Sequence, residues 1–141
     1  MGGEDELDAR IFTSLERIQE HDPLFWWLYL SKCRACGQHW MVAQEERIFD
    51  VFLLRRLDEA AASAIVEMGR WPDEFLTFER VLRLCRARFA PCRFLDRFAG
   101  GLVSTVQDLR RERPSMRPRE IAHLIGVSPA EVVLLMRHGQ A

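Results

Sequence analysis

The 141-residue sequence contains no run of eighteen consecutive apolar residues, so we expect no helix that spans a membrane. Its N-terminal segment is acidic, with Glu4, Asp5 and Glu6, and no apolar stretch follows it as a secretory signal would require. We therefore expect a cytoplasmic protein. Hydrophobic residues make up 48% and charged residues 29%, which excludes a disordered or fibrous chain and is ordinary for a globular one.

The sequence also lacks the patterns that mark common enzymes. It has no glycine-rich phosphate loop, no Gly-x-Ser-x-Gly nucleophile turn and no dinucleotide fingerprint. Its lone tyrosine, Tyr29, and its four histidines are scattered and do not form acid–base pairs along the chain. These absences favour a protein that is not an enzyme.

Lysine is nearly missing, because Lys32 is the only lysine among the 20 basic residues. The formal net charge of −1 hides an uneven distribution: residues 1–22 carry a net charge of −5, whereas residues 80–119 carry +8. A basic block of this kind attracts nucleic acid or an acidic protein. The alternative is a set of solvated helix faces with no partner.

The spacing of apolar residues predicts an α+β fold with a small three-stranded antiparallel sheet and packed helices. An amphipathic helix is expected over residues 5–20, where apolar residues recur at spacings of three and four. The three strands are expected over residues 24–30, 39–44 and 47–53.

Helix start and stop signals follow the strands. Asp58 and Gly69 are typical caps, and they predict a helix over residues 59–67. Further helices are expected over residues 73–89, 94–98 and 102–113, and the second of these should stop at Gly100.

The four cysteines need a role other than structural disulfides, because a cytosolic chain keeps its thiols reduced. Cys33-x-x-Cys36-Gly37 lies between two predicted strands and has the form of a zinc knuckle, which needs a second ligand pair. Cys85 and Cys92 are the candidates for that pair, so structural zinc bound by all four cysteines is one hypothesis. A redox pair at the turn, or a simple hairpin turn with two buried cysteines elsewhere, are the alternatives.

The C-terminal segment over residues 116–137 has the pattern of a helix-turn-helix. Gly126 marks the turn and Ser128 caps the second helix. We therefore expect two domains, an α+β domain over residues 1–99 and a helical extension over residues 100–141. The candidate DNA-binding residues are Arg117, Arg119, Ser128 and Arg137. A packing or dimerisation module is the alternative, because the second helix offers few side chains that read bases.

One stretch resembles a known family. Residues 26–42 contain a Cys-x-x-Cys-Gly-Gln-x-Trp turn that is similar to one in small bacterial immunity proteins, which accompany polymorphic toxins delivered between cells. The resemblance implies a non-enzymatic antitoxin that neutralises a cognate toxin by direct binding. Trp26, Trp27 and Trp40 are the candidates for the partner interface, because interface hot spots favour tryptophan. Alternatively, these rings form the core. A helix-turn-helix transcriptional regulator with a zinc-knuckle-like N-terminal domain is the second hypothesis for the whole protein.

Overall fold

The computed structural model describes residues 13–22 and 25–139, which belong to two compact units. The first unit takes in Met1–Gln44 and Phe52–Pro72, and the second takes in Glu45–Val51 and Asp73–Ala141. The predicted domain boundary between residues 99 and 100 falls inside the second unit, at the start of a helix.

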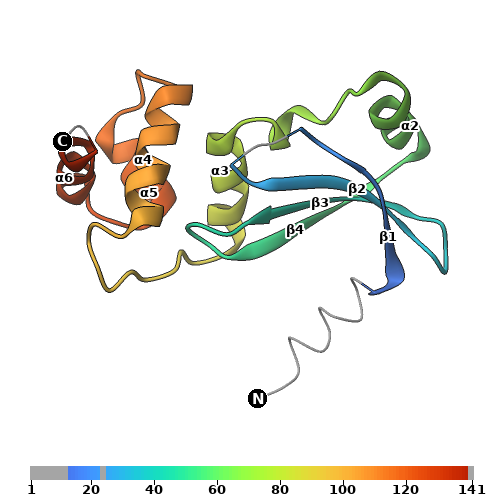
Figure 1. The fold of residues 1–141 in the computed structure, drawn as a ribbon, viewed down its shortest axis with the longest axis horizontal. Helices are drawn as coiled ribbons and strands as arrows, with labels where there is room; N and C mark the ends of the chain where they lie inside the picture. Colours follow the sequence, from blue (N-terminus) through green and yellow to red (C-terminus); the bar gives the residue numbers. More distant parts are fainter. Residues whose placement is uncertain (1–12, 23–24, 140–141) are drawn as a thin grey trace, which may run out of the picture. The chain divides into compact units, whose positions relative to one another are not determined.

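The fold is α+β with an antiparallel sheet, as the sequence predicts. Within the described residues the sheet has four strands rather than three, in the order β1-β2-β3-β4 (Figure 1). The strands are β1 (Leu15–Glu20), β2 (Trp27–Cys33), β3 (His39–Glu45) and β4 (Val51–Leu57). Strands β1 and β2 pair antiparallel, as do β2 and β3.

The additional strand replaces the last part of the predicted N-terminal helix, over Leu15–Glu20. The prediction over residues 5–20 is wrong from Leu15 onward, where the chain pairs with β2; its part before residue 13 lies outside the described residues. A register shift between Arg17 and Gln19 inserts an extra residue, Ile18, into the pairing. The helix-like spacing of Leu15 and Ile18 is therefore the spacing of a strand interrupted by a bulge.

The last strand begins later than predicted because a side chain takes the backbone donors before it. The Glu45 carboxylate accepts hydrogen bonds from the N–H groups of Arg47 at 2.8 Å, Ile48 at 3.0 Å and Phe49 at 2.6 Å. Those N–H groups are then unavailable to a neighbouring strand. Residues 46–49 form a turn, and the predicted strand over residues 47–53 is replaced by β4 from Val51.

Helix α2 (Glu59–Met68) agrees with the predicted helix and its caps. The Asp58 carboxylate accepts a hydrogen bond from Ala61 N–H at 2.8 Å, and Gly69 adopts φ +61° at the C-cap. The Gln19 side-chain amide on β1 donates to Ile65 O on α2 at 3.3 Å. Since Gln19 lies opposite Leu30, α2 lies against the sheet face that carries Leu30.

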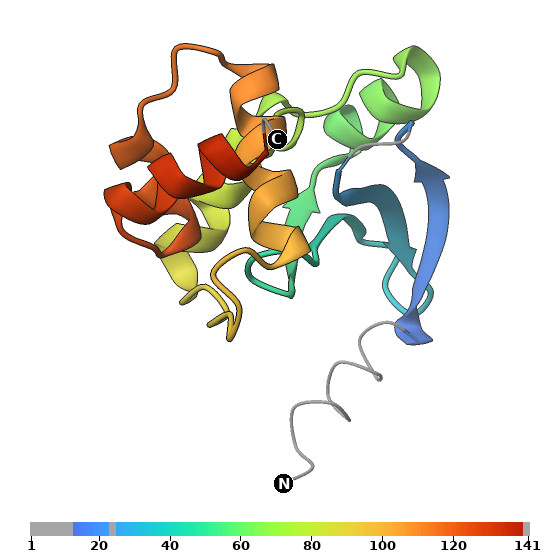
Figure 2. The ribbon, with the colours of Figure 1, turned by 60° about the vertical axis from the view of Figure 1, so that its left-hand side comes forward.

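The second unit is built mainly from helices α3 (Phe78–Arg88), α4 (Gly100–Glu112), α5 (Pro118–Ile125) and α6 (Pro129–His138). In Figure 2 these helices lie side by side, in yellow-green, orange and red. Asp73 begins a short 3₁₀ turn, and Thr77 caps α3. The predicted helix over residues 94–98 is wrong: this segment is a loop, and Gly100 starts α4 instead of ending a helix.

The predicted C-terminal pair is present as α5 and α6. Gly126 adopts φ +75° between them, and the Ser128 hydroxyl accepts a hydrogen bond from Glu131 N–H at 3.2 Å at the start of α6. Buried apolar side chains face inward from both helices, among them Ile121, Leu124 and Leu135. None of the helices within the described residues has the length and apolarity needed to cross a bilayer.

Candidate functional site

The three predicted interface tryptophans occupy three different environments. Trp26 is 5% exposed and belongs to the core of the first unit. Trp27, the first residue of β2, is 48% exposed. Trp40 on β3 is half-buried, with the Arg56 guanidinium 5.6 Å from its ring centre. Trp27 is thus the member of the predicted set that presents a large aromatic surface to solvent.

Strand register places Trp27 and Trp40 on one face of the sheet. Trp40 lies opposite Ser31, and Ser31 and Tyr29 share the β2 face that carries Trp27. We call the side of the sheet that carries Trp27, Tyr29 and Trp40 the aromatic face; on it Tyr29 is buried, Trp40 is half-buried and Trp27 is exposed. Because α2 lies against the face of Leu30, which alternates with these residues, the aromatic face is the side of the sheet that α2 does not cover.

Two arginines that were not predicted from the sequence pack on rings of the aromatic face, Arg17 on Tyr29 and Arg56 on Trp40. The Arg17 guanidinium lies 4.1 Å from the Tyr29 ring centre, in the geometry of a cation–π pair. Phe25, two residues before Trp27, is 44% exposed. The sequence signal for Arg17 was hidden by the wrong helix prediction, which placed it on a different element.

The Cys33–Cys36 turn has the backbone geometry expected of a knuckle. Gly37 N–H donates to Cys33 O at 2.9 Å and Gly37 adopts φ +74°, while Cys33 N–H donates to Gln38 O at 2.8 Å. Hydrogen bonds from the Cys36 N–H, the Cys36 thiol and the Ala35 N–H lower the pKa of Cys33. The turn therefore favours the thiolate, which is the form that binds metal.

The other two cysteines lie in the second unit and differ from this turn. Cys85 on α3 is fully buried, and burial, with the negative charge of Glu45 as the smaller cause, raises the pKa of its thiol to about 12. Cys92 is exposed, and its thiol donates to Phe49 O at 3.5 Å. Across residues 13–22 and 25–139, no group of three or more His, Cys, Asp and Glu side chains is arranged to hold a metal ion.

Zinc binding by the turn stays a prediction with a direct test. Replacing Cys33 by serine is expected to lower the zinc content of the purified protein and its melting temperature together, because a lost ligand removes metal-linked folding free energy. Elemental analysis and thermal denaturation measure the two quantities, and Cys85→Ala should lower the zinc content as well if all four cysteines bind the ion. Wild-type protein that contains no zinc, and melts as the Cys33 variant does, would contradict the prediction.

The predicted DNA-binding residues are spread along the α5–α6 pair, with Arg117 and Arg119 at its start, Ser128 between the helices and Arg137 near its end. Arg117 at the N-cap of α5 and Arg119 in its first turn are exposed, as is Arg137 in the last turn of α6. The Ser128 hydroxyl is used as the α6 cap. The Glu131 carboxylate accepts a hydrogen bond from Ser128 N–H at 2.7 Å, which lowers the pKa of Glu131 and holds a negative charge at this helix end.

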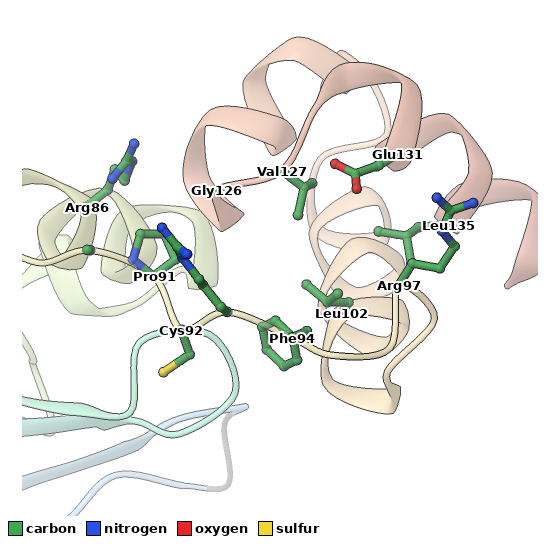
Figure 3. Close-up of a pocket in the computed structure, with 12 residues that line it drawn as sticks. Arg86, Pro91, Cys92, Phe94, Arg97, Leu102, Gly126, Val127, Glu131 and Leu135 are labelled. Atoms are coloured by element: carbon green, nitrogen blue, oxygen red, sulfur yellow. The ribbon is translucent and has the colours of Figure 1, made fainter.

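A cleft of about 400 Å³ lies beside the α5–α6 turn, within the second unit (Figure 3). Its charged lining consists of Arg86 from α3, Arg93 and Arg97 from the loop before α4, and Glu131 from α6. Pro91, Phe94 and Leu135 are among its apolar lining residues. The sequence showed the basic block that contains these arginines but gave no signal that they line one cleft with Glu131 of α6.

Comparison of the whole chain with protein-family models, with curated proteins and with solved structures finds no match.

Proposed function

We propose that this protein is a non-enzymatic binding protein of the immunity or antitoxin type, which neutralises a cognate bacterial toxin by covering its active surface. The observation that carries the proposal is the exposure of Trp27, at 48%, at the edge of the aromatic face and two residues from the half-exposed Phe25. The resemblance of the adjoining Cys33–Cys36 turn to immunity proteins supports the same function.

A partner that covers the exposed rings removes their apolar surface from water, which stabilises the complex. Covering about 100 Å² of apolar surface contributes about 2.5 kcal/mol at 25 cal/mol per Å². Rigid aromatic side chains lose little conformational entropy when a partner covers them, so tryptophan is frequent among interface hot spots. Arg17 and Arg56, stacked on neighbouring rings, add positive charge that would complement an acidic toxin surface.

Replacing Trp27 by alanine is expected to weaken binding of the toxin by about 30-fold or more, because a hot-spot truncation costs about 2 kcal/mol or more. Stability should change little, since the ring is half-exposed. Met68→Ala is the matched control: Met68 is 60% exposed but lies on α2, against the other face of the sheet. Isothermal titration with the purified partner measures both variants. Equal affinities for the two variants would remove Trp27 from the interface.

The partner itself is sought by co-expression with the product of the adjacent gene. We expect a stable complex on size-exclusion chromatography, and we expect this protein to protect cells that express that product. A product that forms no complex, and against which the chain gives no protection, would contradict the proposal.

A second candidate function, a helix-turn-helix transcriptional regulator, is favoured by the α5–Gly126–α6 pair and the exposed Arg117 and Arg119. Arginines at the start of the first helix of such a pair are positioned for the DNA backbone. Fluorescence anisotropy with a labelled duplex from the gene's own upstream region tests it at two salt concentrations. Binding that keeps its preference over random DNA at the higher salt supports a regulator, whereas binding abolished equally for all sequences contradicts it.

A further inference from the structure

The arginine cleft beside α6 is held in place by specific contacts of the loop that carries it. Gly126 has no Cβ, and a Cβ built there would lie 2.6 Å from Pro91 Cγ, so the proline ring packs directly against the α5–α6 turn. Cys92 N–H donates to Ile48 O at 2.7 Å on the other side. The Phe98 ring stacks on His138 of α6 with centroids 4.5 Å apart. These contacts hold the segment from residue 91 to residue 98 in place, so Arg93 and Arg97 extend from a loop with a defined position.

The charge in the cleft is predominantly positive. Arg86 is oriented by a hydrogen bond from its Nε to His123 O on α5 at 3.0 Å, and it is one of the residues that line the cleft. Arg93 and Arg97 are exposed. Glu131 is the acidic residue of the lining, and its carboxylate is held by Ser128 N–H. The positive charge of Arg97 contributes, after Ser128, to the lowered pKa of Glu131, which places Arg97 within electrostatic reach of α6.

This arrangement suits a phosphate better than an apolar ligand. Three guanidinium groups offer planar N–H donors, and guanidinium matches the oxygens of a phosphate in a bidentate way. The cleft opens beside the first turn of α6, the helix that would enter the major groove if the α5–α6 pair binds DNA. Contacts to phosphates on the flank of such a helix fix its position on the duplex.

We infer that the cleft lined by Arg86, Arg93 and Arg97 binds backbone phosphates of duplex DNA and thereby positions α6 on the duplex. The inference rests on the second candidate function and deepens it, because it adds a phosphate clamp on α3 and the loop before α4 to the arginines already predicted at α5. The lining carries three arginines and one carboxylate, and Arg97 lies within electrostatic reach of Glu131, so positive charge predominates beside the first turn of α6.

The test compares duplex binding by the full chain and by the double variant Arg93→Gln/Arg97→Gln. We expect at least a tenfold loss of affinity at low salt, because charge-assisted hydrogen bonds to phosphate are lost. The slope of log K against log salt concentration should decrease by about 0.9 for each phosphate contact removed. Both side chains are exposed, so the melting temperature should stay close to that of the wild type.

The matched control is Arg34→Gln/Arg70→Gln, which removes the same charge from two exposed arginines of the first unit. Wild-type affinity and salt slope in the control, with both reduced in the cleft variant, support the inference. Equal affinities of the two variants for the duplex overturn the inference that the cleft binds phosphates, while the regulator function still stands. A wild-type chain that binds no duplex overturns both. Loss of binding to the adjacent gene product in the cleft variant, without loss of DNA binding, would assign the cleft to an acidic protein and overturn the inference.

Discussion

Replacing Glu45 by alanine is expected to lower the free energy of unfolding by about 3–5 kcal/mol, because it leaves three backbone donors of one turn without their acceptor. Glu45 is fully buried, and its two carboxylate oxygens accept hydrogen bonds from consecutive N–H groups, those of Arg47, Ile48 and Phe49. Ile48 and Phe49 are themselves buried, so water cannot easily replace the lost acceptor. The second unit begins at this turn, and its loss should be felt throughout that unit.

Urea denaturation of the wild type and of three variants, Glu45→Ala, Glu45→Gln and Glu46→Ala, measures the effect. Glu46→Ala is the matched control, since Glu46 is exposed and adjacent, and its stability should lie within about 0.5 kcal/mol of the wild type. Glu45→Gln keeps one acceptor oxygen, so its free energy of unfolding is expected to lie between those of Glu45→Ala and Glu46→Ala. A Glu45→Ala variant as stable as Glu46→Ala would show that the carboxylate does not hold the turn.

The substitution Gly126→Ala is expected to cost about 3 kcal/mol, from two separate causes. A residue with a Cβ pays about 1–2 kcal/mol for the left-handed conformation that Gly126 adopts at φ +75°. The new Cβ would also lie 2.6 Å from Cγ and 3.1 Å from Cβ of Pro91, and a proline ring cannot rotate aside. Overpacking of this kind costs about 1–3 kcal/mol.

The chain supplies a control that separates the two causes. Gly69 also has positive φ, at +61°, but a Cβ there would meet no atom within 4 Å. Gly69→Ala should therefore show only the conformational cost, about 1–2 kcal/mol. Denaturation of both variants measures the difference, and Gly126→Ala combined with Pro91→Ala should recover part of it. Equal losses at the two glycines would mean that Pro91 does not pack against the α5–α6 turn.

Elements with strong local signals could be predicted from the sequence. Helix α2 follows a capping aspartate and ends at a glycine, and α6 follows a Ser-Pro pair that fixes its first turn. Elements whose structure depends on residues far away in the chain could not be predicted. Leu15–Glu20 becomes a strand because β2 is available to pair with it, and the turn before β4 exists because one buried carboxylate takes three N–H groups. The loop over residues 94–98 has apolar residues at helical spacing, yet Leu95 is fully exposed and no helix forms.

The candidate sites likewise differ in whether a local motif or a contact between distant residues defines them. The Cys33–Cys36 turn and the neighbouring tryptophans lie on one stretch of chain, so a motif could identify them. Sequence could not show that Trp26 is buried while Trp27, the first residue of β2, is exposed, because the direction in which each of two adjacent tryptophans points is set by the packing of the whole unit. The arginine cleft depends on Pro91 meeting Gly126, a contact between residues far apart in the chain, and no local pattern encodes it.

The most direct test of the proposed function is a titration of toxin activity. The purified product of the adjacent gene is assayed with increasing amounts of this protein, of Trp27→Ala and of Met68→Ala. The account predicts complete inhibition at one equivalent of wild type or Met68→Ala, and incomplete inhibition by Trp27→Ala at concentrations where a 30-fold weaker complex dissociates. Full toxin activity in the presence of excess wild-type protein would contradict it.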